Sequence, residues 1–246
     1  CIRDSPRAEV YDAIYRCQKA GIAVKMITGD QQMTAQAIGE DLNITKPHID
    51  SVGGEKLEEL DDEITIAGGS STLVPLDLLD FPAIDRLAAN IFERWGILDF
   101  LISNAAMLGK LTPLHHYDPS TWDNVINLNL VANQRLIRSF DPLLRQSSHG
   151  RALFLSATVA RVATPYWGAY ATSKSGLEMM IQVYAKETEK TNLKVNIVDP
   201  GITRTNLRAS AFPGEDASKL KSPKTLVPLF LKLCSAGNKA HGQLIK

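Results

Sequence analysis

The sequence contains little cysteine, no long apolar run and no excess of charge of either sign. Its three cysteines, Cys1, Cys17 and Cys234, are too few and too scattered along 246 residues to form a disulfide framework or a zinc site. No apolar run approaches the roughly 20 residues of a membrane-spanning helix, and no signal peptide opens the chain. We therefore expect a soluble, cytoplasmic protein with no membrane span and no metal site.

Positive and negative charges balance each other. The 27 Lys and Arg residues match 27 Asp and Glu residues, so the formal net charge is zero. Proteins that bind nucleic acid or anionic membranes usually carry a strongly basic surface, and this composition predicts neither kind of partner. With 44% hydrophobic residues, the chain can bury a sizeable core.

Apolar runs typical of buried strands alternate with segments of helical periodicity. Strand–helix units of this kind predict a parallel sheet with right-handed crossovers and helices on both faces. The expected fold is α/β, a doubly wound, Rossmann-like, three-layer α/β/α domain that covers residues 1–246, with ligands beyond the carboxyl ends of the strands. Helices are predicted at 8–20, 31–42, 57–67, 82–95, 120–145, 167–190 and 223–234, and strands at 22–28, 48–52, 72–76, 98–102, 151–155, 193–198 and 243–245.

Tyr170 and Lys174 are four residues apart in the predicted helix 167–190, so their side chains lie on one face. A nearby ammonium favours the phenolate, and we expect it to lower the tyrosine pKa from its ordinary value of about 10 towards neutrality. Such a phenol can move a proton on or off a carbonyl or alcohol oxygen. The spacing alone also fits a surface helix on which the two residues meet by chance.

From about residue 55 to residue 246, the sequence resembles the short-chain dehydrogenase/reductase family. Five separated motifs carry the resemblance and occur in the family's order. They are Leu76-Asp77, Ser103-Asn104-Ala105-Ala106, Asn129, the Tyr170–Lys174 pair, and Asp199-Pro200-Gly201 followed by Thr203. The resemblance implies an NAD(P)-dependent oxidoreductase that transfers a hydride between nicotinamide and a small carbonyl or alcohol substrate, and a homodimer or homotetramer.

The resemblance also implies roles for individual residues. Tyr170 would be the acid/base, Lys174 its electrostatic partner and a ribose ligand, and Asn129 a support for a proton-relay water. The remaining cofactor contacts implied by the motifs are Asp77 at the adenine ring, Asn104 and Ala105 in the turn after a strand, and Pro200, Gly201 and Thr203 at the nicotinamide carboxamide.

One departure from the family concerns its catalytic serine, which usually lies thirteen residues before the tyrosine. That position is Ala157, with Ser156 and Thr158 on either side. Strand side chains alternate between faces, so a neighbour takes over the role only where a bulge intervenes or the strand has already ended. Both flanking hydroxyls therefore remain catalytic candidates.

A second departure concerns the glycine-rich loop T-G-x-x-x-G-x-G that the family uses to bind pyrophosphate. Thr28 and Gly29 are present and remain cofactor-binding candidates, but Met33 and Ala35 replace the two later glycines. About twenty residues further on, Asp50 could accept the ribose hydroxyls and so favour NAD over NADP, or it could be a solvated surface residue.

Residues 1–50 resemble instead part of the phosphorylation domain of cation-transporting P-type ATPases. The matching segments are Asp-Ser-Pro-Arg at 4–7, Met-Ile-Thr-Gly-Asp at 26–30 and Thr-Ala-Gln-Ala-Ile at 34–38. The phosphorylation motif D-K-T-G-T and the membrane spans are missing, which excludes ion pumping. The sequence thus suggests a chimera of an ATPase-like segment (1–50) and a dehydrogenase-like segment (55–246). The alternative to an active oxidoreductase is a chimeric or designed scaffold without efficient catalysis or cofactor binding.

Overall fold

The computed structural model describes residues 62, 64–66, 68–72, 74 and 76–246. The predicted elements up to residue 52, and with them Thr28, Gly29 and Asp50, lie outside these residues. The chain divides into two compact units, Cys1–Asp80 and Phe81–Lys246.

In the first unit, residues 62 and 64–66 are helical, in agreement with the predicted helix 57–67. The strand predicted at 72–76 is wrong for the described positions 72, 74 and 76, which are not in a strand. The apolar pattern there is short and includes a proline, and proline lacks the N–H group that a sheet ladder needs.

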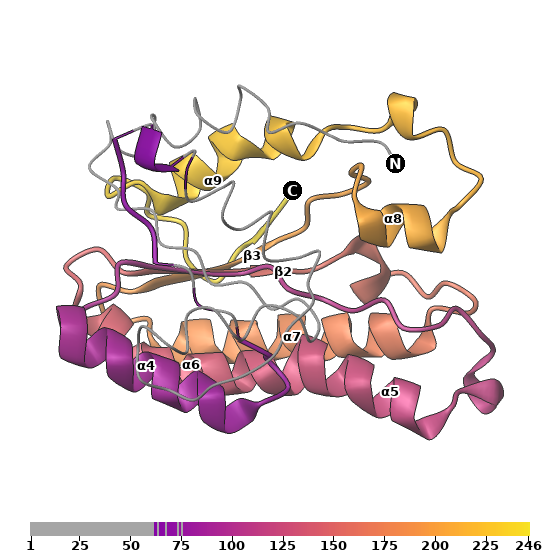
Figure 1. The fold of residues 1–246 in the computed structure, drawn as a ribbon, viewed down its shortest axis with the longest axis horizontal. Helices are drawn as coiled ribbons and strands as arrows, with labels where there is room; N and C mark the ends of the chain where they lie inside the picture. Colours follow the sequence, from indigo (N-terminus) through magenta and orange to yellow (C-terminus); the bar gives the residue numbers. More distant parts are fainter. Residues whose placement is uncertain (1–61, 63, 67, 73, 75) are drawn as a thin grey trace. The chain divides into compact units, whose positions relative to one another are not determined.

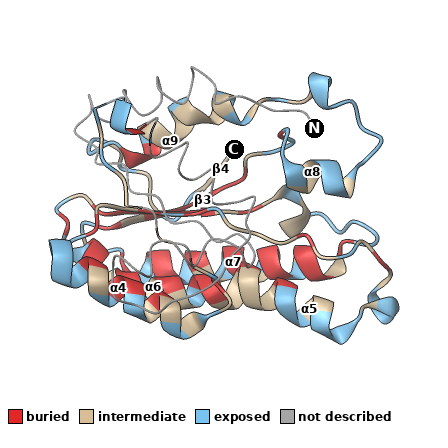
Figure 2. Ribbon diagram, viewed as in Figure 1, coloured by how far each residue is buried: buried red, intermediate tan, exposed pale blue. Residues whose placement is uncertain are grey.

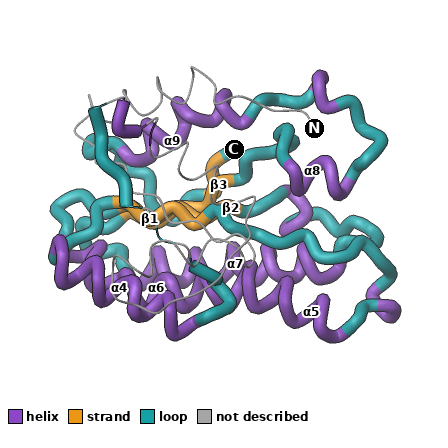
Figure 3. The backbone as a smooth tube through the Cα atoms, in the orientation of Figure 1, coloured by secondary structure: helices purple, strands orange, loops and turns teal. Residues whose placement is uncertain are grey.

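A parallel sheet forms the centre of the second unit (Figure 3). Its strands follow one another in the order β1-β2-β3-β4. The strands are β1 (Phe100–Ser103), β2 (Arg151–Leu155), β3 (Lys194–Val198) and β4 (Leu244–Ile245). Phe100 lies opposite Arg151, and Arg151 lies opposite Lys194. The two middle strands are buried along most of their length, as expected of strands covered on both faces.

One face of this sheet is covered by α4 (Phe81–Trp95), by a long helix of three parts, and by α7 (Gly168–Glu187) (Figure 1). The long helix consists of α5 (Pro119–Ile126), the π-helical turn η2 (Asn127–Val131) and α6 (Ala132–Gln146). The side chain of Asp118 caps its first turn by accepting a hydrogen bond of 2.9 Å from the Thr121 amide. Buried residues of these helices gather on the side that faces the sheet (Figure 2).

The opposite face carries α8 (Asn206–Ala211) and α9 (Val227–Cys234), which complete the three layers (Figure 1). From β3 to β4 the strand order continues in the same direction as before, but the chain between these strands crosses the opposite face of the sheet. This crossover therefore has the opposite hand from the β1–β2 and β2–β3 crossovers. The prediction of right-handed crossovers is therefore wrong for this last connection. Several short helices and loops separate β3 from β4, so the twist of β3 does not fix the hand as it does when a single helix follows the strand directly.

The α/β fold class is confirmed, and in the second unit most predicted strands and helices lie within three residues of the observed bounds. The exceptions are the predicted helix 223–234, of which α9 covers only Val227–Cys234, and α8, which was not predicted. The long helix is interrupted by the irregular turn η2, and Pro142 lies inside α6. Short helical turns complete the unit: η1 (Leu114–His116), η3 (Thr158–Ala160), η4 (Ala217–Lys219) and η5 (Pro223–Leu226). None of the helices in the described part of the chain has both the length and the apolarity needed to cross a membrane.

Candidate active site

Tyr170 and Lys174 lie one turn apart on α7, and both are almost completely buried, with exposed fractions of 5% and 2%. The Lys174 Nζ atom lies 5.8 Å from the centroid of the Tyr170 ring. It donates a hydrogen bond of 2.8 Å to the main-chain oxygen of Leu155, the last residue of β2. The pair therefore lies at the carboxyl ends of the parallel strands.

The pKa values of this pair differ from the expectation. Burial, with a smaller contribution from the Asp199 carboxylate, raises the pKa of Tyr170 to about 12. Burial also lowers the pKa of Lys174 to about 8, against an opposing contribution from Glu178. The prediction of a lowered tyrosine pKa is therefore wrong for this structure, because burial of the phenol disfavours its charged form. At neutral pH the Tyr170 hydroxyl is protonated and can donate.

Asn129 is fully buried in the π-helical turn and fixes the segment that follows β1. Its Oδ1 accepts from the Met107 amide (2.8 Å), and its Nδ2 donates to the Met107 oxygen (2.9 Å) and to Ser173 Oγ (3.0 Å). The main-chain oxygen of Asn129 accepts a 2.8 Å hydrogen bond from Asn133 Nδ2, and Asn133 Oδ1 accepts one of 2.6 Å from Ser103 Oγ. This buried network joins the end of β1 to the Tyr170 helix.

Two turns at the carboxyl ends of the strands contain most of the other site candidates. Asn104 and Ala105 directly follow β1, where Asn104 is exposed and Ala105 is half-buried. After β3, Gly201 has a φ of +65°, a conformation that glycine adopts without strain, and nothing lies within 4 Å of the position that a Cβ would take. Thr203 Oγ1 donates to the main-chain oxygen of Pro200 at 3.1 Å.

Asp77, the remaining cofactor-binding candidate among the described residues, belongs to the first unit. There its Oδ1 accepts a hydrogen bond of 2.9 Å from the Leu79 amide.

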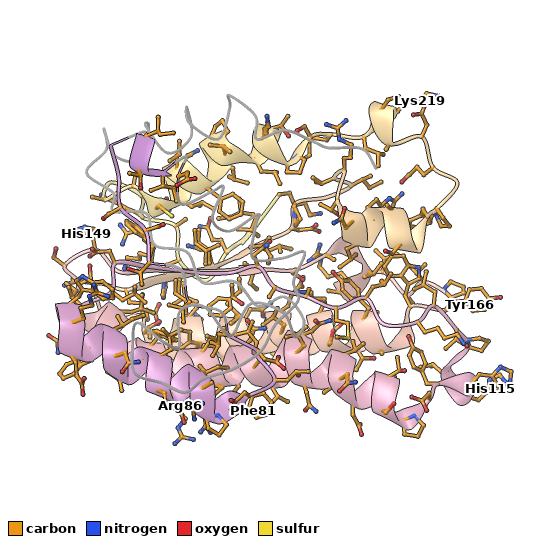
Figure 4. The ribbon with its side chains drawn as sticks, viewed as in Figure 1. Phe81, Arg86, His115, His149, Tyr166 and Lys219 are labelled. Atoms are coloured by element: carbon orange, nitrogen blue, oxygen red, sulfur yellow. The ribbon has the colours of Figure 1, made fainter. Side chains whose placement is uncertain are left out.

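Apolar side chains surround the Tyr170 ring. We call this set, formed by the buried residues Leu108, Trp167 and Tyr170, the apolar cluster. The Trp167 ring centroid lies 5.9 Å from that of Tyr170 and 5.8 Å from that of Phe212. Partly buried residues pack against the cluster: Ala106, Leu111, Ala157, Val159, Ala171, Leu207 and Ala211. Tyr166, by contrast, lies at the surface of the molecule with 60% of its area exposed (Figure 4).

Ala157 packs against the apolar cluster, whereas the hydroxyls on either side of it are bound by carboxylates. Ser156 Oγ donates to Glu178 at 2.5 Å, and Thr158 Oγ1 donates to Asp199 at 3.0 Å. Ala157 has extended backbone angles (φ −153°, ψ 155°) just before η3. A methyl group therefore stands in the position from which the resemblance expects a serine.

Arg161 is a residue that the sequence did not single out. Its guanidinium forms ion pairs with both Glu178 and Asp199. The two partners are 17 and 38 residues away along the chain, so no local pattern indicates the arrangement.

Comparison with known proteins adds independent evidence. The family whose description is "short chain dehydrogenase" matches residues 23–216. The uncharacterised oxidoreductase YciK of Escherichia coli K12 is 41% identical over 160 residues, which is 64% of this chain and 63% of that protein, so the chain spans less than two thirds of this relative. The 2,3-dihydro-2,3-dihydroxybenzoate dehydrogenase of Bacillus subtilis is 27% identical over 216 residues, 84% of this chain and 82% of that protein.

Solved structures agree with this result. A protein from Shigella flexneri 2a, described as a short-chain dehydrogenase and complexed with NADP, is 32% identical with a TM-score of 0.79 over 95% of this chain and 90% of its own. Another from Escherichia coli CFT073, complexed with NADPH, is 37% identical with a TM-score of 0.74 over 78% of this chain and 81% of its own. The family match begins at residue 23, so it includes part of the segment 1–50 that the sequence motifs assign to a different family.

Proposed function

We propose that this chain, which belongs to the short-chain dehydrogenase family, is an NAD(P)-dependent oxidoreductase that acts on the carbonyl or alcohol group of a small molecule. The observation that carries the proposal is the buried Tyr170–Lys174 pair at the carboxyl ends of the parallel strands. Two similar structures are complexes with NADP and NADPH, which makes NADP(H) the first cofactor to test.

In the proposed reaction, Tyr170 donates its proton to the carbonyl oxygen during reduction and accepts it from the alcohol during oxidation. Its raised pKa keeps the proton on the phenol at neutral pH. Lys174, with a pKa of about 8, is mostly protonated there and places a positive charge beside the phenol. Asn129 supports the site by holding both Met107 and Ser173 in place.

The described residues suit a nicotinamide cofactor, because the main chain at Gly201 is open and the exposed Asn104 lies at the same edge of the sheet. When bound, the nicotinamide supplies or accepts the hydride. We propose that Lys174 binds its ribose. The other proposed cofactor-binding residues are Asn104, Ala105, Pro200, Gly201 and Thr203 in the second unit, with Thr28, Gly29, Asp50 and Asp77 in the first.

A second candidate function is a Rossmann-like scaffold without efficient catalysis. Ala157 favours it, because the site lacks the hydroxyl that the family places beside the tyrosine, and so do Met33 and Ala35 in the phosphate loop. In this proposal, residues 1–50 are an ATPase-like segment joined to a dehydrogenase-like segment (55–246) within a single domain.

Titration of the protein with NADPH and NADH, followed by nicotinamide fluorescence, separates the two candidates. Binding in the micromolar range, together with reduction of aldehydes or ketones that is lost in Tyr170→Phe, is the result expected of an oxidoreductase. Absence of binding for both nucleotides would reject the oxidoreductase in favour of the scaffold.

We also propose that the chain forms a homodimer or homotetramer. Met179 and Val183, one helical turn apart on α7, are 61% and 49% exposed, and a partner chain would cover such an apolar pair. Light scattering on the purified protein tests this, and a monomer at micromolar concentration would contradict it.

A further inference from the structure

Beside the Tyr170 site, Arg161 joins two buried carboxylates that come from different elements. Its Nη1 pairs with Glu178 on α7, and its Nη2 pairs with Asp199 at the end of β3. The two acidic side chains are only 8% and 2% exposed, whereas that of Arg161 is 26% exposed. One arginine from the connection between β2 and α7 therefore links three parts of the site.

Asp199 uses both of its carboxylate oxygens. Oδ2 accepts from Thr158 and pairs with Arg161, while Oδ1 accepts a hydrogen bond of 3.0 Å from the Gly201 amide. The conformation of the turn after β3 therefore depends on this carboxylate, and the carboxylate depends on the arginine for its counter-charge. A buried ion that loses its partner is strongly destabilised, so Arg161, the Asp199 carboxylate and the turn at Gly201 act as a unit.

We infer that Arg161 is a positioning residue for the Tyr170–Lys174 pair: it neutralises the Asp199 carboxylate at the end of β3 and holds that carboxylate against the turn at Gly201. Arg161 touches neither Tyr170 nor Lys174 through a hydrogen bond or ion pair found here, so it acts through Asp199 and Glu178. The inference rests on the proposed function, because it gives Arg161 a part in the proton transfer by Tyr170.

The charges around the phenol support this role. Within the part of the chain that the structure describes, Lys174 and Glu178 on α7, Asp199 after β3 and Arg161 form one group of two cations and two anions. The Asp199 charge acts to raise the pKa of Tyr170, and the Glu178 charge acts to raise that of Lys174.

A further charged pair, formed by a residue of α8, makes no hydrogen bond or ion pair with this group among the described residues. Arg208 on α8 and Glu215 bind each other through two contacts of 2.6 Å.

Without Arg161, the Asp199 charge would disfavour the phenolate more strongly, because charges in a poorly solvated site are weakly screened.

Four single variants test the inference. Arg161→Met removes the cation. In this variant, kcat/KM for alcohol oxidation is expected to begin its rise at a pH that is higher by roughly 0.5–1 unit. Arg161→Lys keeps one charge and is expected to move it less, and Asp199→Asn is expected to move it downward. Arg135→Met is the matched control with no shift, because Arg135 is 25% exposed and pairs with Asp85 on α4.

A second measurement needs neither substrate nor cofactor. The absorbance of tyrosinate, recorded just after a rapid jump to alkaline pH, reports tyrosine ionisation before the protein unfolds. The signal of Tyr170 alone is obtained by subtracting the titration of the same protein with the additional substitution Tyr170→Phe. The pKa of Tyr170 is expected to rise in Arg161→Met and to fall in Asp199→Asn.

An unchanged Tyr170 pKa in folded Arg161→Met overturns the inference. If that variant does not fold, an unchanged pKa in Asp199→Asn does so. Shifted tyrosinate titrations in a protein without oxidoreductase activity would reject the proposed function alone.

Discussion

Replacement of Ala157 by serine is expected to increase the rate of carbonyl reduction. Ala157 packs against the cluster that contains Tyr170, and its extended backbone accepts a serine without strain. The added hydroxyl would supply a second hydrogen bond to the oxygen that Tyr170 protonates. The neighbouring hydroxyls do not already fill this role, because Ser156 donates to Glu178 and Thr158 donates to Asp199.

The size of the gain follows from what one such donor contributes elsewhere. Removal of a single preorganised donor from a reacting oxygen costs about 10²–10³ in rate, or about 2.7–4 kcal/mol. A donor newly introduced into a site that has not been shaped around it recovers part of this, so we expect kcat to increase about tenfold, equivalent to about 1.4 kcal/mol. KM should change less, because the hydrogen bond strengthens as negative charge develops on the oxygen.

The assay is steady-state oxidation of NADPH with a panel of small aldehydes and ketones. Ala211→Ser is the matched control, since Ala211 packs against the same cluster from α8. An equal gain in Ala211→Ser would refute the reasoning, because the effect would then come from added polarity alone. A gain that persists in Ala157→Ser combined with Tyr170→Phe would refute it as well.

Three further predictions concern the acid/base pair itself. Tyr170→Phe should reduce activity about 10²–10⁴-fold without lowering the melting temperature by circular dichroism, and a fully active variant would contradict the assignment. The folded-state pKa of Lys174, about 8 against 10.5 for the free side chain, means that the unfolded chain binds this proton more tightly. Lys174→Met should therefore be more stable than the parent below pH 8, by at most about 3 kcal/mol, and urea unfolding should show the advantage disappearing as the pH approaches 10.5. Finally, kcat/KM for alcohol oxidation should rise between pH 7 and 10 while that for carbonyl reduction does not, since oxidation needs the phenolate and Tyr170 has a pKa of about 12; parallel pH profiles would contradict this.

Much of the second unit could be predicted because its signals are local. The 3.6-residue periodicity of α4 and α7 and the apolar runs of β2 and β3 depend on neighbours in sequence. The same locality places Tyr170 and Lys174 together, since four residues make about one helical turn. The order of the family motifs then predicted that the turns after β1 and β3 lie at the same edge of the sheet, which the parallel strand order confirms.

The electrostatics of the site could not be predicted in the same way. Sequence spacing brings an ammonium near a phenol but does not reveal that both are almost fully buried, and burial decides the direction of both pKa shifts. The directions of the Ser156 and Thr158 hydroxyls depend on carboxylates from other elements, 22 and 41 residues away. Tertiary packing supplies these contacts, so no periodic pattern in the sequence indicates them.

These features together favour a proton-donating site. A phenol with a pKa of about 12 holds its proton throughout the neutral range, and a methyl group, that of Ala157, packs against the cluster that contains this phenol. The Asp199 carboxylate strengthens this state, and Arg161 limits how far it does so. Reduction of a carbonyl uses the protonated phenol directly, whereas oxidation must first remove its proton. We therefore expect carbonyl reduction to be favoured over alcohol oxidation at neutral pH.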